Sequence, residues 1–135
     1  MRITKATDVA LRILMTLAAD PQRQTTIEAL SAQLAVPRTH VAKVVQCLAR
    51  QGWVATSRGR SGGLTITAPG RATTVGRVVA ALEGEEPVVT CDHPPCPLAP
   101  PGCRLQGLLD QALNAFMATL DEHTIDDIAH PTIAP

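Results

Sequence analysis

The sequence has 135 residues, of which 45% are hydrophobic and 18% are charged, so it predicts a single folded domain and excludes a disordered chain. Trp53 and Phe116 are its only aromatic residues, which favours packed helices with aliphatic cores over a β-sandwich. The net charge of zero conceals an asymmetry, because residues 1–80 carry a net charge of +8 and residues 81–135 carry −8. Unless the charges cluster by chance, this difference indicates that the first part faces a polyanion and the second part avoids it.

No membrane segment is expected, because no stretch approaches the ~20 consecutive apolar residues that cross a bilayer. Arg2 and Lys5 precede an apolar run, as in an export signal, but Asp8 and Arg12 break that pattern and fit a helix better. The sequence shows neither a nucleophile paired with a base nor a phosphate-binding glycine loop. We therefore expect a cytoplasmic protein that is not an enzyme.

Three helices are expected in the first part of the chain. Apolar residues at helical spacing predict the first over residues 7–19. The second is predicted to begin at Thr25, which forms a capping box with Glu28 three residues later. The third should start at Pro37, a residue suited to the first helical position, and should run to about Arg50.

The third helix has two distinct faces. Its apolar face consists of Val41, Val44, Val45 and Leu48. The opposite face is polar and basic and consists of Thr39, His40, Lys43, Gln46 and Arg50. Two short helices joined by a tight turn, the second with a basic outer face, predict a helix-turn-helix, although a solvated amphipathic helix would give the same pattern. Cys47 lies between the two faces and is interpreted as a packing residue.

A short β-hairpin is predicted after the third helix. Residues 53–56 and 64–67 favour strands, and the segment between them contains three glycines together with Arg58 and Arg60. Glycine lets a backbone approach a DNA groove closely, and arginine favours the negative potential of a narrow minor groove. Directly after a basic helix-turn-helix, this cationic tip predicts the wing of a winged helix.

These elements predict double-stranded DNA as a partner. The N-terminal end of a recognition helix reads base edges, so base contacts are expected from Arg38, Thr39 and His40. The other basic side chains are expected to contact phosphates and the minor groove, and they are Lys43, Arg50, Arg58 and Arg60.

The remaining sequence predicts a short helix over residues 74–82, a proline-rich loop and a long helix. Five prolines among the thirteen residues of 91–103 exclude a helix there. Eight apolar side chains then recur at helical spacing and form a dimerisation stripe, Leu105, Leu108, Leu109, Ala112, Leu113, Phe116, Met117 and Leu120. A last short turn follows at residues 124–128, and the fold class is mainly α with a small hairpin wing. Three regions result, a winged-helix region (1–84), a cysteine loop (85–103) and a dimerisation helix with its tail (104–135).

The proline-rich loop holds Cys91, Cys96 and Cys103 in the spacing C-x4-C-x6-C. An odd number of cysteines in a cytosolic chain fits a disulfide framework badly. Structural zinc requires four ligands, usually with a closer cysteine pair, and His93 could supply the fourth. An iron–sulfur cluster is larger and accepts wider spacing, but three thiolates leave it in need of one more ligand. The spacing alone leaves zinc and an iron–sulfur cluster both open.

Several motifs in this order resemble one family. The opening MRITKATDVALR resembles its first helix, and PRTHVAKVV and RGRSGGL, which begin at Pro37 and Arg58, resemble its recognition helix and wing. The three-cysteine loop is followed by Cys103-Arg104-Leu105 and a long helix. Over residues 1–128 the sequence is thus similar to the winged-helix iron–sulfur regulators that include IscR and NsrR.

Three details favour the NsrR branch, which comprises nitric-oxide-sensing repressors. They are the Thr7-Asp8 pair, the pattern Pro-x-x-His-x-x-Lys, and the ending Leu120-Asp121-Glu122-His123-Thr124-Ile125. The resemblance implies a homodimer joined by the long helix and bound to a palindromic operator. It also implies a [4Fe–4S] cluster near the dimer interface.

The implied cluster ligands are Cys91, Cys96 and Cys103, with Asp8 of the partner subunit as the fourth. A hard carboxylate oxygen is a weaker partner for iron than a thiolate, so it would leave one iron open to nitric oxide. Release of Asp8 would then uncouple the cluster from the winged helix. The alternative is that Asp8 is only a carboxylate favoured by the helix dipole.

Two other functions remain as alternatives. One is an IscR-like regulator with a [2Fe–2S] cluster that responds to redox state or to iron–sulfur supply. The other is a ferredoxin-like electron carrier, but a basic helix-turn-helix and an arginine-glycine wing have no purpose in such a protein. Salt-sensitive binding to a palindromic DNA distinguishes a regulator from a carrier.

Overall fold

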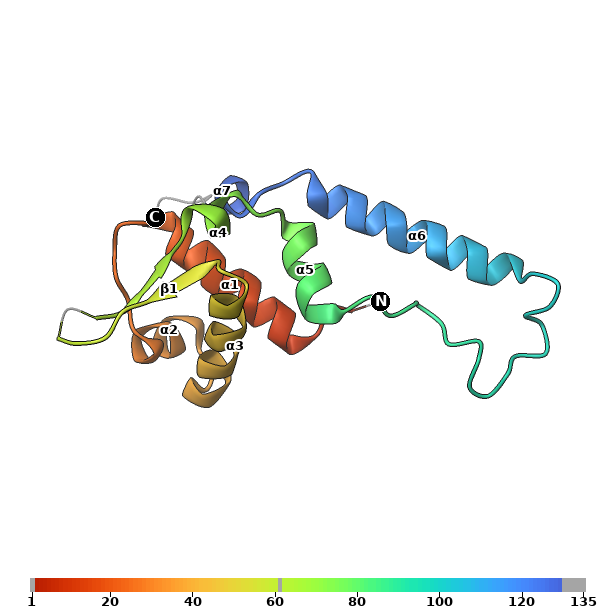
Figure 1. The fold of residues 1–135 in the computed structure, drawn as a ribbon, viewed down its shortest axis with the longest axis horizontal. Coiled ribbons are helices and arrows are strands. Elements are labelled where there is room, and N and C mark those ends of the chain that lie inside the picture. Colours follow the sequence, from red (N-terminus) through yellow and green to blue (C-terminus); the bar gives the residue numbers. More distant parts are fainter. Residues whose placement is uncertain (1, 61, 130–135) are drawn as a thin grey trace.

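The computed structural model describes residues 2–60 and 62–129. Ser61 of the predicted wing and residues 130–135 of the predicted tail lie outside the described residues. The described chain is mainly helical and contains one two-stranded sheet (Figure 1). Its elements in order are α1 (Lys5–Ala19), α2 (Ile27–Leu34), α3 (Arg38–Arg50), β1 (Val54–Thr56), β2 (Leu64–Ile66), α4 (Ala68–Ala72), α5 (Val75–Glu83), α6 (Arg104–Asp121) and α7 (Ile125–Ile128).

Helix α1 forms the centre of the core. Val9, Ala10, Ile13 and Leu14 are completely buried, and α1 packs against α3, α5 and α7. The helix starts two residues before the predicted start, because the hydroxyl of Thr4 accepts a hydrogen bond from the Thr7 amide and caps the first turn.

The helix-turn-helix of α2 and α3 is present, and the predicted apolar face of α3 is buried. The predicted capping box at Thr25 is wrong. Thr26 is the N-cap of α2 and accepts from the Ala29 amide, whereas Thr25 exchanges backbone hydrogen bonds with Leu64 of β2. Thr25 is therefore held as an extended residue beside the hairpin, which moves the helix start onto the next threonine. Pro37 is likewise the N-cap of α3 rather than its first residue.

The predicted hairpin is confirmed. Strands β1 and β2 are antiparallel, with Val54 opposite Ile66 and Thr56 opposite Leu64. Beyond them the Ser57 amide donates to the Gly63 carbonyl at 2.9 Å, which extends the stem toward the tip. Gly59 at the tip has a φ of 104°, a conformation that favours glycine over any residue with a side chain. The hairpin projects from the rest of the protein as a wing (Figure 1).

Two short helices join the wing to the C-terminal part of the chain. The sequence did not predict α4, whose N-cap Thr67 is bonded to the Gly70 amide. Helix α7 confirms the predicted last turn, and its Ile125 is completely buried in the same core as α1. Residues 2–83 and 124–129 thus form one packed unit, which we call the body.

Residues 85–121, which we call the arm, comprise the cysteine loop and α6. The arm extends along the long axis of the molecule, on the side opposite the wing (Figure 1). Residues 91–103 contain no helix, as their prolines predict. Helix α6 runs for 18 residues without one buried side chain. Within the described residues, no helix is both long and apolar enough to cross a membrane.

Candidate functional site

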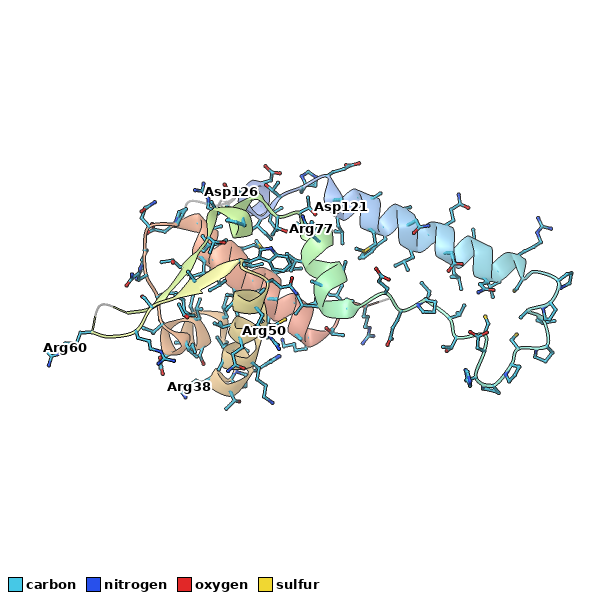
Figure 2. All side chains as sticks on the ribbon, viewed as in Figure 1. Arg38, Arg50, Arg60, Arg77, Asp121 and Asp126 are labelled. Atoms are coloured by element: carbon cyan, nitrogen blue, oxygen red, sulfur yellow. The ribbon has the colours of Figure 1, made fainter. Side chains whose placement is uncertain are left out.

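The first candidate surface consists of α3 and the wing. The N-terminal end of α3 projects from the body near Arg38, and Arg60 lies at the tip of the wing (Figure 2). The predicted DNA contacts are solvent-accessible, with His40 half-buried and the others exposed, namely Arg38, Thr39, Lys43, Arg50, Arg58 and Arg60. The structure therefore brings the predicted residues together on one helix and the adjoining hairpin, the arrangement with which winged helices contact DNA.

One acidic side chain accompanies this basic surface. The Arg38 Nε donates to Oε1 of Glu28 at 2.8 Å, across the turn between α2 and α3. A hydrogen bond from the Glu28 backbone, and then the Arg38 guanidinium, lower the pKa of the Glu28 carboxyl below its ordinary value. Glu28 therefore stays ionised at neutral pH and holds Arg38 at the start of α3.

The second candidate site is the cysteine loop of the arm. The Cys96 amide donates to the Cys91 carbonyl at 2.9 Å, so a turn brings the first two cysteines together. Cys103 is the N-cap of α6, so the third cysteine lies where the loop meets this helix. Burial, followed by the neighbouring charges of Cys96 and Cys103, raises the pKa of the Cys91 thiol.

The donor set of this loop suits an iron–sulfur cluster. All three cysteines are free thiols and half-buried, so each can be reached from solvent. Among the described residues, no group of three or more His, Cys, Asp or Glu side chains lies close enough to hold a single metal ion. A cluster bridges more widely separated thiolates than one ion does, so the residues present fit the cluster.

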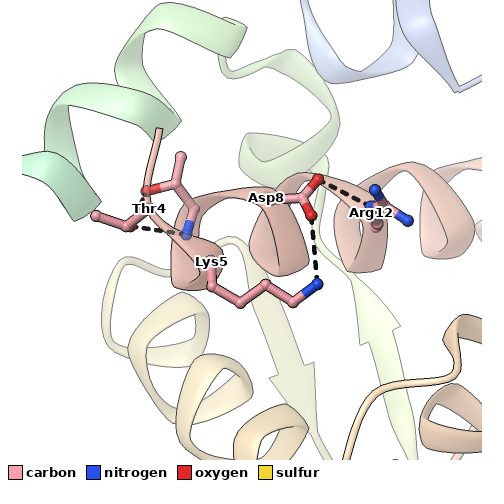
Figure 3. A network of polar contacts seen from close by, with 5 residues as sticks. Thr4, Lys5, Asp8 and Arg12 are labelled. Atoms are coloured by element: carbon pink, nitrogen blue, oxygen red, sulfur yellow. Dashed lines mark hydrogen bonds and ion pairs between the residues drawn. The ribbon is translucent and has the colours of Figure 1, made fainter. Parts of the chain in front are cut away.

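Asp8 lies in the first turn of α1, in the body (Figure 3). Its Oδ1 accepts from Arg12 Nε at 2.8 Å, and its Oδ2 lies 3.8 Å from Lys5 Nζ. Within one chain the structure does not bring Asp8 to the cysteines, since α1 lies in the body while the loop lies on the arm (Figure 1). The Asp8 side chain is 31% exposed, so a second chain could reach it.

Sequence reasoning missed a link between α1 and the start of the arm. Oε1 of Glu83, the last residue of α5, accepts from the Thr4 amide at 2.7 Å and from the Thr7 hydroxyl at 2.5 Å. These hydrogen bonds lower the pKa of the Glu83 carboxyl. The partners are 76 or more residues apart in sequence, so no local motif could have revealed them.

A second missed link fixes the base of α6 to the body. Asp121 accepts from the Thr74 hydroxyl at 2.6 Å, and its carboxylate packs so closely on Gly76 that a Cβ there would collide with it. Arg71 and Asp126 form a two-pronged ion pair between α4 and α7, with a shortest distance of 2.8 Å. The labelled Arg77, Asp121 and Asp126 mark this junction in Figure 2.

The predicted dimerisation stripe divides into two sides in the structure. The more exposed members are Leu105, Leu108, Ala112 and Phe116, and the half-buried members are Leu109, Leu113, Met117 and Leu120. Met117 and Leu120 pack against the core of the body, and a groove of about 910 Å³ lies between α5, residues 84–88 and α6. Leu105 and Leu108 each remain 60% exposed. Exposed apolar side chains that gather on one face of a helix are typical of an interaction surface.

Comparison with known proteins identifies the group to which this winged helix belongs. The model of the Rrf2 family, described as iron-dependent transcriptional regulators, matches residues 3–131. The chain belongs to the Rrf2 family. It is also 46% identical over 136 residues to the HTH-type transcriptional repressor NsrR of Streptomyces coelicolor, an alignment that covers 98% of this chain and 91% of the relative. The protein is therefore a transcriptional regulator of the Rrf2 family and not an enzyme.

Solved structures show the same Rrf2 fold. Oxidized CymR of Staphylococcus aureus matches with a TM-score of 0.79 and 19% identity, covering 99% of this chain and 100% of that one. The IscR of T. potens matches with a TM-score of 0.75 and 15% identity, covering 95% and 85% of the two chains. At these identities the likeness supports the winged-helix fold alone, and it confirms the predicted fold class.

Proposed function

We propose that this protein is a cytoplasmic, homodimeric repressor whose binding to a palindromic operator is controlled by an iron–sulfur cluster that reacts with nitric oxide. The observation that carries the proposal is the presence, on one arm, of three free, accessible thiols and a helix whose apolar side is partly exposed. The relative at 46% identity, named NsrR, supports the same assignment.

The ligands of the cluster are Cys91, Cys96 and Cys103. The loop turn positions the first two, and the N-terminus of α6 positions the third. When bound, a [4Fe–4S] cluster supplies iron that nitric oxide can attack. Cys47, on α3 in the body, takes no part in holding it.

Asp8 of the partner subunit is the fourth ligand in this proposal. Its carboxylate has two cationic neighbours, Lys5 and Arg12, and its side chain is partly exposed. Loss of the cluster would release Asp8, and α1 packs directly against the recognition helix α3. Helix α1 thus offers a direct route from the cluster to the DNA-binding surface.

The operator is contacted by α3 in the major groove and by the wing in the minor groove. Dimerisation through the exposed side of α6 relates two copies of the body by a two-fold axis, so the operator has two related half-sites. The arm that joins the two copies carries five acidic side chains against one basic one, a negative balance that keeps it away from DNA.

Anaerobic purification followed by absorption and Mössbauer spectroscopy tests the cluster. The wild type is expected to be coloured, to contain iron and sulfide, and to change its spectrum on addition of nitric oxide. Alanine at Cys91, Cys96 or Cys103 should give colourless protein, whereas the matched Cys47→Ala variant should keep the wild-type spectrum. A colourless wild type, or colour retained in all three loop variants, would contradict the proposal, and the Mössbauer spectrum distinguishes [4Fe–4S] from [2Fe–2S].

Replacement of Asp8 by alanine tests the ligand from the partner subunit. A ligand role predicts that the three cysteines still hold a cluster, with an altered spectrum, altered reactivity toward nitric oxide and weaker operator binding. If Asp8 is only a carboxylate favoured by the helix dipole, the variant should lose roughly 0.3–1 kcal/mol in the free energy of unfolding and show no spectral change. A wild-type spectrum together with wild-type operator affinity would therefore exclude Asp8 as a ligand.

A further inference from the structure

We propose that Glu28 is a specificity-determining residue, which positions Arg38 to read a guanine in each half of the operator. The inference deepens the proposed function and rests on the contact between α3 and DNA. Its starting point is the ion pair between Arg38 Nε and Glu28 Oε1 at 2.8 Å.

The placement of Arg38 is electrostatically unfavourable within its own helix. Arg38 is the first residue of α3, where the positive end of the helix dipole disfavours a cation. The first turn of α3 holds no acidic residue, and the N-cap Pro37 makes no side-chain cap. Glu28, from the first turn of α2, supplies the missing negative charge across the turn.

The ion pair uses Nε of Arg38, whereas a base is recognised by the end of the guanidinium. The contact with Glu28 is made by Nε, and the end of the guanidinium carries two further nitrogens whose N–H groups can donate to a base. Two parallel N–H donors match the O6 and N7 acceptors of guanine in the major groove. Arg71 shows the contrasting case, because it gives both Nε and a terminal nitrogen to Asp126 and has no comparable free pair.

Glu28 also affects DNA binding through its charge. Its side chain is 62% exposed, within a region whose net charge is +8, so its carboxylate repels any phosphate that approaches α3. An Arg38 without this restraint could bend onto a phosphate, which would strengthen binding to every DNA sequence equally. Glu28 is thus expected to lower non-specific affinity and to raise the ratio of specific to non-specific affinity.

Selection from a library of duplexes with a randomised centre tests the inference, with full-length, anaerobically purified protein. The wild type is expected to select a guanine at one position of each half-site. Glu28→Gln should weaken that preference and reduce the ratio of operator to random-duplex affinity by roughly tenfold. Glu28→Asp keeps the charge but is too short to hold Arg38, so it should behave like Glu28→Gln. Asp20→Asn removes the same charge elsewhere in the basic region and should leave the ratio unchanged.

Arg38→Ala separates this inference from the proposed function. It should abolish the guanine preference, and the double variant Glu28→Gln/Arg38→Ala should show no further change in base preference, because Glu28 affects that preference only through Arg38. A wild-type ratio in Glu28→Gln alongside a loss in Arg38→Ala would overturn the role of Glu28 alone. Full operator affinity and guanine preference in Arg38→Ala would overturn both this inference and the proposed contact of Arg38 with DNA.

Discussion

The body and the arm differ in how many apolar side chains they bury and in the sign of their charge. Every buried apolar side chain among the described residues lies in the body, whereas α6 of the arm has none. The body contains the basic helix-turn-helix and wing, while the arm carries one basic side chain against five acidic ones. The contrast indicates that the body folds around its own core, whereas the arm needs an additional partner to cover its apolar side.

The two candidate sites also lie in different regions, the DNA-binding surface on the body and the cysteine loop on the arm. The body presents α3 and the wing, and a hydrogen bond from Thr74 to Asp121 attaches α6 of the arm to it, whereas Glu83 and Asp126 make their contacts within the body. In the proposed function, the arm holds the thiols that bind the cluster. Any change at the cysteine loop must therefore reach the DNA-binding surface through α1, through these contacts, or through the partner subunit.

The largest expected effect comes from a charge on the exposed side of the arm. Leu108→Asp would place a carboxylate in the proposed dimer interface, where an unpaired buried charge is costly, so dimer affinity should fall by roughly 100-fold. Sedimentation should then show monomers that bind the operator poorly. Gln111→Asp, at an exposed polar position of α6, should remain dimeric. A normal dimer in Leu108→Asp would place the interface elsewhere.

A smaller effect is expected from one cation of the body. Arg60→Ala removes one phosphate or minor-groove contact, so binding to all DNA should weaken. The slope of log affinity against log salt should also become shallower by about one. Fluorescence anisotropy at several salt concentrations measures both quantities. Arg104→Ala removes the single cation of residues 81–135 and should change neither. An unchanged slope in Arg60→Ala would remove the wing tip from the DNA interface.

The smallest expected effect concerns Glu83, which joins the end of α5 to the start of α1 directly before the arm begins. Because hydrogen bonds from Thr7 and Thr4 lower the pKa of Glu83 below 4.5, the folded protein favours the ionised carboxylate. Glu83 therefore contributes to the free energy of unfolding above the unfolded pKa, and this contribution disappears as the pH falls through the folded pKa. Urea denaturation of Glu83→Gln should show a loss near pH 7 that shrinks below pH 4.5. A difference that does not vary with pH would contradict this role.

The sequence predicted local patterns better than contacts between distant segments. The buried face of α3, the hairpin and the proline-rich loop all follow from spacing and composition over a few residues. The cap of α2 was assigned to the wrong threonine because the backbone of Thr25 forms hydrogen bonds with Leu64, which is far along the chain. Helix α4 was missed, although Thr67 as N-cap with Pro69 in the first turn provides a recognisable start signal.

In the candidate sites, too, local features could be predicted and contacts between distant segments could not. The exposure of the cations on α3 and the wing could be predicted, because a basic side chain opposite an apolar face must meet solvent. The links made by Glu28, Glu83 and Asp126 could not, since each joins separate elements through a side chain. The expectation that Asp8 is a ligand from the partner subunit came from the family resemblance alone, because a contact between two chains leaves no local pattern in the sequence.

Operator binding by anaerobically purified protein, before and after addition of nitric oxide, tests most directly whether the arm controls the body. Anisotropy of a labelled operator and absorption of the cluster can be followed in the same sample. The proposed coupling predicts that operator affinity falls at least tenfold, in step with the spectral change, since a typical coupling free energy is about 1–3 kcal/mol. A cluster that reacts fully while operator affinity stays constant would show that the arm does not regulate the DNA-binding surface.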